Sequence, residues 1–265
     1  EVGFFGLIGA GGKVQKLHVQ GTVKSTGTAN QTGGIAGVMS DTEGVASIMD
    51  CTFEGTVSGG SQVGGIVGSV GLNNKVERCG SDATVSGSER IGGIAGACSY
   101  GNIYYCRNRG KVGAKNAKHV GGIVGDMQNY AVVCGSYNTG SVTGATCVGG
   151  IAGKHTGGTD PTVTNCYNTG SVKGASCGAL VGEYAAEIRN SYYLEGSASA
   201  ATGNTKDGVN VEATAKTAAE MKETAFVLAL GNEAFHQDDG RNGGYPLLAW
   251  QGGTHVVNTA AAEAI

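Results

Sequence analysis

A five-residue motif, Gly-Gly followed by Ile or Leu, then Ala or Val, then Gly, recurs along the chain at a nearly constant interval. Complete copies begin at Gly33, Gly64, Gly92, Gly121 and Gly149, and two variants flank them at residues 5–9 and 178–182. Successive copies are 28 to 31 residues apart. A fixed period of this length is typical of a solenoid, in which every repeat forms one structural unit and stacks on its neighbours.

Aligning the copies produces columns in which the same type of residue returns in every repeat. Because β-branched residues dominate and a helical period of 3.6 is absent, each repeat is expected to form short strands. Parallel strands stack about 4.8 Å apart, which places the members of a column directly above one another. Three columns carry this prediction: Leu7, Ile35, Ile66, Ile94, Ile123, Ile151 and Leu180; Val23, Val57, Val85, Val112, Val142 and Val172; and Leu17, Cys51, Cys79, Cys106, Ser136, Cys166 and Ser191.

The predicted fold is therefore all-β, a parallel β-helix (β-solenoid) of about seven turns with a small C-terminal α+β cap. The repeats occupy residues 1–196, and residues 197–265 form a linker, the cap and a flexible end that begins at residue 258. Glycine makes up 50 of the 265 residues. We expect the glycine pairs at corners of the coil, where glycine either supplies a positive φ or lets two backbones approach closely.

The cap is expected over residues 217–250. Thr217 and Glu220 have the spacing of a capping box, which predicts the start of a helix, and Gly231 is expected to end it. Apolar residues at helical spacing follow the capping box, namely Met221, Ala225, Leu228 and Ala229. An open coil end exposes strand edges, so this segment is expected to cover it, with Trp250 packed on the last turns.

A second block recurs between the glycine motifs. Residues 165–174, Asn-Cys-Tyr-Asn-Thr-Gly-Ser-Val-Lys-Gly, match residues 135–144 almost residue for residue. Together with the glycine motif, this block resembles the GLUG repeats of bacterial extracellular proteins over residues 5–196. Residues 244–250 are similar to the segment that commonly closes such arrays. GLUG repeats occur in adhesin-like surface proteins and beside the protease domains of IgA-specific metallopeptidases.

The resemblance implies a non-catalytic extracellular repeat module of a bacterial surface or secreted protein, which acts as an adhesin or as a structural stalk. Its implied partners are host or matrix glycans or glycoproteins, together with other domains of a longer precursor. The chain begins inside a repeat and shows no export signal, so we expect a fragment of such a precursor at the cell surface or outside the cell. The metalloprotease motif His-Glu-x-x-His is absent from the sequence.

The main alternative is a carbohydrate-active enzyme, a lyase or hydrolase, because such enzymes also use parallel β-helices. They need carboxylates gathered on one face of the coil. The column that follows the glycine motif contains Asp126, Lys154 and Glu183 on successive turns, after Val38, Ser69 and Ala97. This acid–base–acid series is the nearest approach to a catalytic group, and it is equally consistent with a surface ladder of ion pairs.

Two other surfaces are candidates for binding. Tyr137 and Tyr167 occupy matching positions, where they form either a contact surface for a ligand or a stacked structural ladder. The residues beside the valine column form a row of hydroxyl groups that lysines interrupt, and ice binding is a minor alternative for this face. The row consists of Thr22, Lys24, Thr56, Ser58, Thr84, Ser86, Lys111, Gly113, Ser141, Thr143, Ser171 and Lys173.

No metal or other cofactor is expected. Cys51, Cys79, Cys106 and Cys166 share an inward column and are predicted to be free, buried thiols. Cys147 and Cys177 are predicted to share another column, where a disulfide is possible. The five histidines are scattered and are expected at the surface, and residues 238–243 are expected to form a tight polar turn rather than a calcium loop.

The charge of the chain argues against two classes of partner. The net charge is −3, with no basic stripe that could hold phosphates, so nucleic acid is not an expected partner. The sequence contains no stretch of about 18 apolar residues, so this segment is not expected to insert into a membrane.

Overall fold

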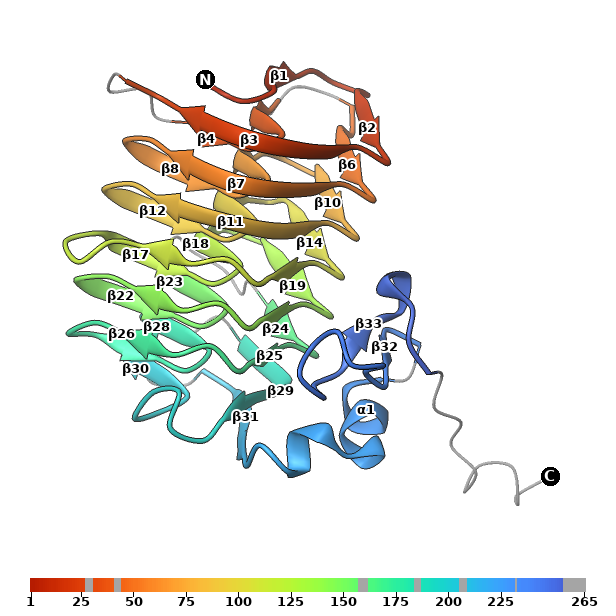
Figure 1. Cartoon of the computed structure of the whole chain (residues 1–265). Helices are drawn as coiled ribbons and strands as arrows, with labels where there is room; N and C mark the ends of the chain where they lie inside the picture. Colours follow the sequence, from red (N-terminus) through yellow and green to blue (C-terminus); the bar gives the residue numbers. More distant parts are fainter. Residues whose placement is uncertain are drawn as a thin grey trace.

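The computed structural model describes residues 1–26, 31–40, 44–156, 162–183, 187–204, 209–231 and 233–254. It is a mostly β parallel solenoid of about six turns, with one short α-helix near the C-terminus (Figure 1). This confirms the predicted fold class. Partial turns lie at both ends of the six complete turns. The predicted number of about seven turns counted repeats that form these partial turns. The predicted flexible end at residues 258–265 lies outside the described residues.

Three parallel sheets form the walls of the solenoid. The first has six strands: β4 (Thr32–Gly33), β8 (Ser61–Gly64), β12 (Glu89–Gly92), β17 (Lys118–Gly121), β22 (Thr146–Gly149) and β27 (Cys177–Gly178). The second has eight strands: β1 (Phe5–Ile8), β5 (Ala36–Met39), β9 (Val67–Val70), β13 (Ala95–Ser99), β18 (Val124–Gln128), β23 (Ala152–Thr156), β28 (Val181–Glu183) and β30 (Thr202–Asn204).

The third sheet has 17 strands and bends at a corner, so that it supplies two walls. One wall consists of β2 (Lys13–Gln15), β6 (Ser47–Met49), β10 (Lys75–Glu77), β14 (Asn102–Tyr104), β19 (Val132–Cys134), β24 (Thr162–Thr164) and the first part of β29 (Glu187–Leu194). The other consists of β3 (His18–Lys24), β7 (Thr52–Ser58), β11 (Gly80–Ser86), β15 (Arg107–Asn108), β16 (Val112–Gly113), β20 (Tyr137–Asn138), β21 (Val142–Thr143), β25 (Tyr167–Asn168), β26 (Val172–Lys173), the remainder of β29, and β31 (Val211–Lys216).

The predicted columns form the core. The valine column is in register from Val23 to Val172, and its members from Val57 onward are buried. The isoleucine column is fully buried from Ile35 to Leu180. Since each member packs on its equivalent in the next turn, one continuous apolar core runs along the whole solenoid.

The first copy of the motif lies in a different register from the one predicted. Strand pairing sets Phe5 opposite Ala36 and Leu7 opposite Val38. In this register Phe4, and not Leu7, is aligned with Ile35, the first buried member of the isoleucine column. Leu7 is consequently 56% exposed instead of buried. The main-chain hydrogen bond from Gly33 N to Val2 O (2.9 Å) fixes this register.

The glycine pairs are required for close backbone approach and not for a positive φ. A Cβ on the first glycine of a pair, such as Gly121, would lie closer than 3.0 Å to the carbonyl oxygen of Val124, where the chain turns between two sheets. A Cβ on the second glycine, such as Gly122, would lie that close to the carbonyl oxygen of Gly150 in the next turn. Neither glycine has a left-handed φ.

Mostly non-glycine residues occupy the left-handed conformation at the corners, with Gly135 (φ 59°) among them. In one corner column φ is 55° at Asp50, 50° at Arg78, 53° at Tyr105 and 51° at Asn165. Left-handed backbone costs an L-residue roughly 1–2 kcal/mol. The hydrogen bonds of the neighbouring strands hold these residues in place, and the bend points their side chains away from the core.

Asparagines form a buried ladder inside the solenoid. Asn108 Nδ2 donates to Asn138 Oδ1 (2.7 Å), and Asn138 Nδ2 donates to Asn168 Oδ1 (2.8 Å). Each side chain also hydrogen-bonds to the backbone two residues further on, so the buried amides are satisfied. Asn138 fills the space that a Cβ on Gly122 would need, which explains why the glycine motif and the Tyr-Asn block occur in the same repeats.

The C-terminal segment contains η1 (Glu220–Lys222), α1 (Thr224–Leu230), the antiparallel pair β32 (Phe235–His236) and β33 (Leu247–Leu248), and η2 (Ala249–Gln251). The predicted capping box between Thr217 and Glu220 is present, but it precedes a short 3-10 turn, and α1 begins after it. As predicted, Gly231 ends the helix.

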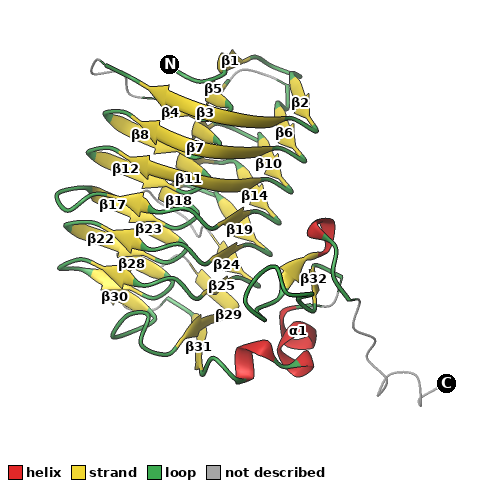
Figure 2. Ribbon diagram, viewed as in Figure 1, coloured by secondary structure: helices red, strands yellow, loops and turns green. Residues whose placement is uncertain are grey.

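This segment packs against a side of the solenoid and not over its open end as predicted (Figure 2). Its apolar residues, Met221, Phe226, Val227, Leu230, Phe235 and Leu248, form a second core with Tyr137 and Tyr167. Trp250 reaches further up the side, to a middle turn, where its Nε1–H donates to the carbonyl oxygen of Tyr105 (2.7 Å). Among the described residues, no helix has the length and apolar character needed to cross a membrane.

Candidate functional site

The three charged residues of the predicted column come together as the spacing indicates. Strand pairing aligns Asp126 on β18 with Lys154 on β23, and Lys154 with Glu183 on β28. Lys154 Nζ lies 3.1 Å from Glu183 Oε1. The Asp126 side chain is fully buried, and its Oδ2 lies 3.2 Å from Arg90 Nε and accepts a hydrogen bond from Gln128 Nε2 (2.9 Å).

Two residues on the adjacent corner extend this polar cluster. Cys147 Sγ donates to Glu183 Oε2 (2.9 Å), and His119 Nδ1 lies 3.5 Å from Glu89 Oε1. Burial, followed by the neighbouring carboxylate of Glu183, raises the pKa of the Cys147 thiol to about 11. Burial also lowers the pKa of His119. The thiol is thus protonated and the imidazole neutral at pH 7, so neither carries charge into the cluster.

The charged side chains of this cluster neutralise one another in pairs, Arg90 with Asp126 and Lys154 with Glu183. The hydrogen bond from Cys147 and the contact with Lys154 lower the pKa of Glu183, which keeps it ionised. Glycoside hydrolysis needs one carboxyl group that holds a proton and a second that reaches the substrate. Asp126 is buried beneath its partners, and Glu183 is paired with Lys154, so the arrangement provides a cross-turn ion-pair network.

The tyrosine pair is placed in the interior. The Tyr137 and Tyr167 rings are stacked, with centroids 4.9 Å apart and planes 6° from parallel, and both side chains are fully buried. Tyr137 Oη donates to Gln251 Oε1 (3.0 Å), and Tyr167 Oη hydrogen-bonds to the carbonyl oxygen of Pro246 and accepts from Asn242 Nδ2 (3.0 Å). The pair attaches the C-terminal segment to the solenoid.

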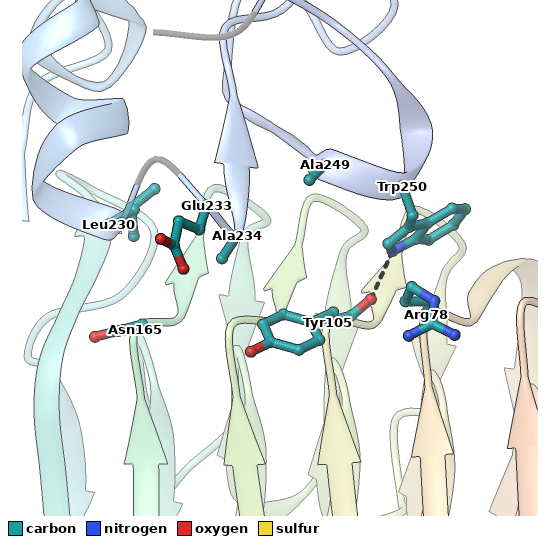
Figure 3. A pocket seen from close by; sticks show the side chains of 9 residues that line it. Arg78, Tyr105, Asn165, Leu230, Glu233, Ala234, Ala249 and Trp250 are labelled. Carbon is teal, nitrogen blue, oxygen red and sulfur yellow. Dashed lines mark hydrogen bonds between the residues drawn. The ribbon is translucent and has the colours of Figure 1, made fainter. Parts of the chain in front are cut away.

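A groove that the sequence did not indicate lies between the solenoid and the C-terminal segment (Figure 3). Its volume is about 530 Å³. Corner residues Arg78, Tyr105 and Asn165 form one wall, and Leu230, Gly231, Glu233, Ala234, Ala249 and Trp250 form the other. Because the two walls are about 65 to 170 residues apart along the chain, sequence spacing could not bring them together. The one available signal was the single Trp of the chain, which was expected on the last turns.

The cysteines and histidines also have defined places. All eight cysteines are free. Cys51, Cys79, Cys106 and Cys166 are fully buried as predicted. Cys177 pairs with Val148 and not with Cys147, so the two thiols are in different columns and form no disulfide.

The expectation that the histidines lie at the surface is wrong for His155. This residue is the strand partner of Met127 in the next turn, in an inward column, and is only 8% exposed. His255 lies outside the described residues. No group of three metal-ligating side chains occurs within the described ranges.

Residues 238–243 form a polar turn. The Asp238 carboxylate accepts from the backbone N–H groups of Arg241 (2.9 Å), Asn242 (3.0 Å) and Gly244 (2.7 Å). The hydroxyl row is in register at Thr22, Thr56 and Thr84, as its spacing indicated.

Comparison with known proteins agrees with this architecture. Residues 144–173 match the family model described as the GLUG motif. A search of the curated proteins finds no match. Among solved structures, the chain is similar to a crystal structure from Bacteroides ovatus described as a "putative immunoglobulin A1 protease". The TM-score is 0.65 and the identity 21%, over 91% of this chain and 76% of the other. At this identity the likeness is one of fold. The chain is a parallel β-solenoid that carries the GLUG motif.

Proposed function

We propose that this chain is a non-catalytic extracellular repeat module of a bacterial surface or secreted protein, which acts as an adhesin or as a stalk that presents neighbouring domains. The observation that carries this proposal is the unbroken register of the valine and isoleucine columns along the solenoid, to which the asparagine ladder adds over three turns. Such columns make every turn share one core with its neighbours, which favours a stiff rod.

The polar cluster supports a structural rather than a catalytic role. Asp126 is fully buried in contact with Arg90, and the Glu183 carboxylate is engaged by Lys154 and Cys147. A lyase or hydrolase would need at least one of these groups free to meet a sugar. The ion pairs instead join neighbouring turns, Arg90 with Asp126 on β18 and Lys154 on β23 with Glu183 on β28.

The proposal is tested by localisation and by an assay for cleavage. Antibodies against this module should label intact cells of the producing organism or detect it in the culture medium, and proteinase treatment should remove the epitope of a flanking domain before that of the solenoid. The purified chain should release neither reducing ends nor unsaturated products from a panel of polysaccharides. Cleavage that disappears in an Asp126→Asn/Glu183→Gln double variant would instead establish the enzyme alternative, and labelling only of lysed cells would overturn the surface assignment.

A further inference from the structure

The groove between the corner of the solenoid and the C-terminal segment has the size and the lining of a small-molecule site. Ligand pockets usually enclose about 300–1,000 Å³, are largely apolar and carry a few oriented polar groups. The volume here is about 530 Å³, and the lining combines two aromatic side chains, Tyr105 and Trp250, with the polar groups of Arg78, Asn165 and Glu233. We propose that this groove binds a neutral sugar ring of a glycan, an inference that rests on the adhesin form of the proposed function.

Tyr105 supplies a rigid aromatic surface. Its backbone is fixed on both sides, because its N–H donates to the carbonyl oxygen of Cys134 (3.0 Å) and its own carbonyl oxygen accepts from Trp250 Nε1 (2.7 Å). The left-handed φ of 53° turns the ring outward from the corner. The C–H groups on one face of a pyranose ring pack against such a surface, and preorganisation keeps the entropic cost of binding low.

Two polar side chains border the aromatic surface. The Glu233 carboxylate is exposed and faces the same space as the Tyr105 ring (Figure 3), where it can accept hydrogen bonds from sugar hydroxyls. The Asn165 amide is held in one orientation because its Oδ1 accepts from Asn190 Nδ2 (2.9 Å). An aromatic face beside a carboxylate and an oriented amide matches a ligand that has an apolar face and a rim of hydroxyls.

The local charge selects neutral over anionic sugars. Arg78 is the cation of the groove, and its guanidinium is engaged by the carboxylates of Asp50 (Nε to Oδ1, 2.6 Å) and Glu77. Asp50 and Glu77 therefore more than neutralise this guanidinium, and Glu233 adds a carboxylate to another part of the lining. A sialic or uronic acid would bring a further negative charge into this environment, and like charges in proximity oppose binding.

The single Trp provides a direct test, since Trp250 lines the groove. The emission of the intact chain is titrated with neutral hexoses, N-acetylhexosamines and their short oligosaccharides, and with sialylated and uronic acid counterparts. We expect a saturable change with at least one neutral sugar and a weaker response to its anionic counterpart. Tyr105→Asn should reduce the affinity about tenfold. The backbone tolerates asparagine at this corner, because Asn165 has a left-handed φ in the same column.

A matched control separates loss of the ring at this site from a general effect of the substitution. Tyr100→Asn makes the same change at the same φ of 53° in another corner column, beside Asn73 and Asn129, and should leave the affinity unchanged. Glu233→Gln, at an exposed position, should weaken binding severalfold without disturbing the attachment of the C-terminal segment.

Three results would overturn the inference: no saturable response to any neutral sugar up to about 10 mM, equal losses in both tyrosine variants, or a preference for anionic sugars. These results would leave the surface location and the absence of cleavage untouched, so the stalk form of the proposed function would stand. Cleavage of the sugars, by contrast, would remove the proposed function itself.

Discussion

At the scale of single residues, the second glycine of each motif is matched to one side chain in its own turn. Gly122 leaves room for the Asn138 amide, and Gly150 does the same for Asn168. The asparagine then hydrogen-bonds to its equivalent in the next turn. A glycine here is therefore part of a polar core, and its cost in conformational entropy is offset by the satisfied amide ladder.

Gly122→Ala should lower the free energy of unfolding by roughly 3 kcal/mol or more, because its Cβ would contact both a backbone carbonyl and the Asn138 side chain. Urea denaturation of the purified variant measures this loss. Gly9→Ala is the matched control, since a Cβ on Gly9 has no neighbour within 4 Å. Equal stability of the two variants would refute the close-packing account.

At the scale of strands, ion pairs between turns reinforce the hydrogen-bonded ladders on the outside of the coil. Asp82 on β11 accepts from Arg107 Nη1 (2.8 Å) and Nη2 (2.9 Å) on β15, and from Arg109 Nε (2.7 Å). Arg107 also lies over the Trp250 ring, 6.0 Å from its centroid. The same guanidinium thus connects two turns and the C-terminal segment.

The Asp82 network should give stability a defined dependence on pH. Burial alone would raise the pKa of Asp82, but the hydrogen bonds from Arg107 and Arg109 more than offset this, and the pKa falls to about 2 from an ordinary value of 3.8. A depressed pKa contributes stability above the ordinary value, and this contribution is lost as the pH falls toward about 2. After allowance for solvent screening, Asp82→Asn should therefore cost about 2 kcal/mol at pH 7 and progressively less in acid.

Urea denaturation between pH 7 and pH 2 measures this difference between the wild type and the variant. Glu54→Gln is the control, because Glu54 is the strand partner of Asp82 one turn away and is exposed. A difference that stays constant across the pH range would show that the Asp82 charge does not contribute in the way described.

At the scale of the whole molecule, the two ends of the solenoid are not equivalent. At the C-terminal end, β29 pairs with β31, and the following segment packs back along the side. At the N-terminal end, β1 and β3 each have a strand neighbour only on the inner side, and Phe4 and Leu7 are 60% and 56% exposed. Turns that lack a neighbour open more readily than turns within an array.

Amide hydrogen exchange should accordingly show a gradient. The amides of β12, β13 and β17, which have neighbours on both sides, should exchange most slowly, and those of β1 and β3 should exchange fastest among the strands. Mass spectrometry of peptic peptides resolves these segments. Uniform protection from β1 to β29 would contradict the prediction and indicate that the array opens only as a unit.

The repeat itself was predictable because a parallel coil stacks equivalent residues, so that sequence columns become structural ladders. This reasoning succeeded for Ile35 to Leu180 and for the line from Asp126 to Glu183. It failed for Leu7. Residues 5–9 match the sequence motif, but main-chain hydrogen bonds to Val2 set a different strand register.

The position of Trp250 could not be predicted in the same way. A non-repeating segment has no equivalent in another turn, so its docking depends on surface shape that spacing does not encode. The groove that it forms with Tyr105 was missed for the same reason, as was the contact of Arg90 with Asp126, which depends on the left-handed bend at a corner.

The pairing of one glycine with one asparagine inside a single turn also has an evolutionary consequence. Each of the three repeats that contain Asn108, Asn138 and Asn168 carries both halves of its own steric fit and offers the same hydrogen-bond donor and acceptor to a neighbouring copy of the same kind. Duplication or loss of a whole repeat therefore changes the length of the rod by one strand spacing, about 4.8 Å, without creating a new incompatibility. Unequal recombination between tandem copies can thus change the length of the solenoid in discrete steps.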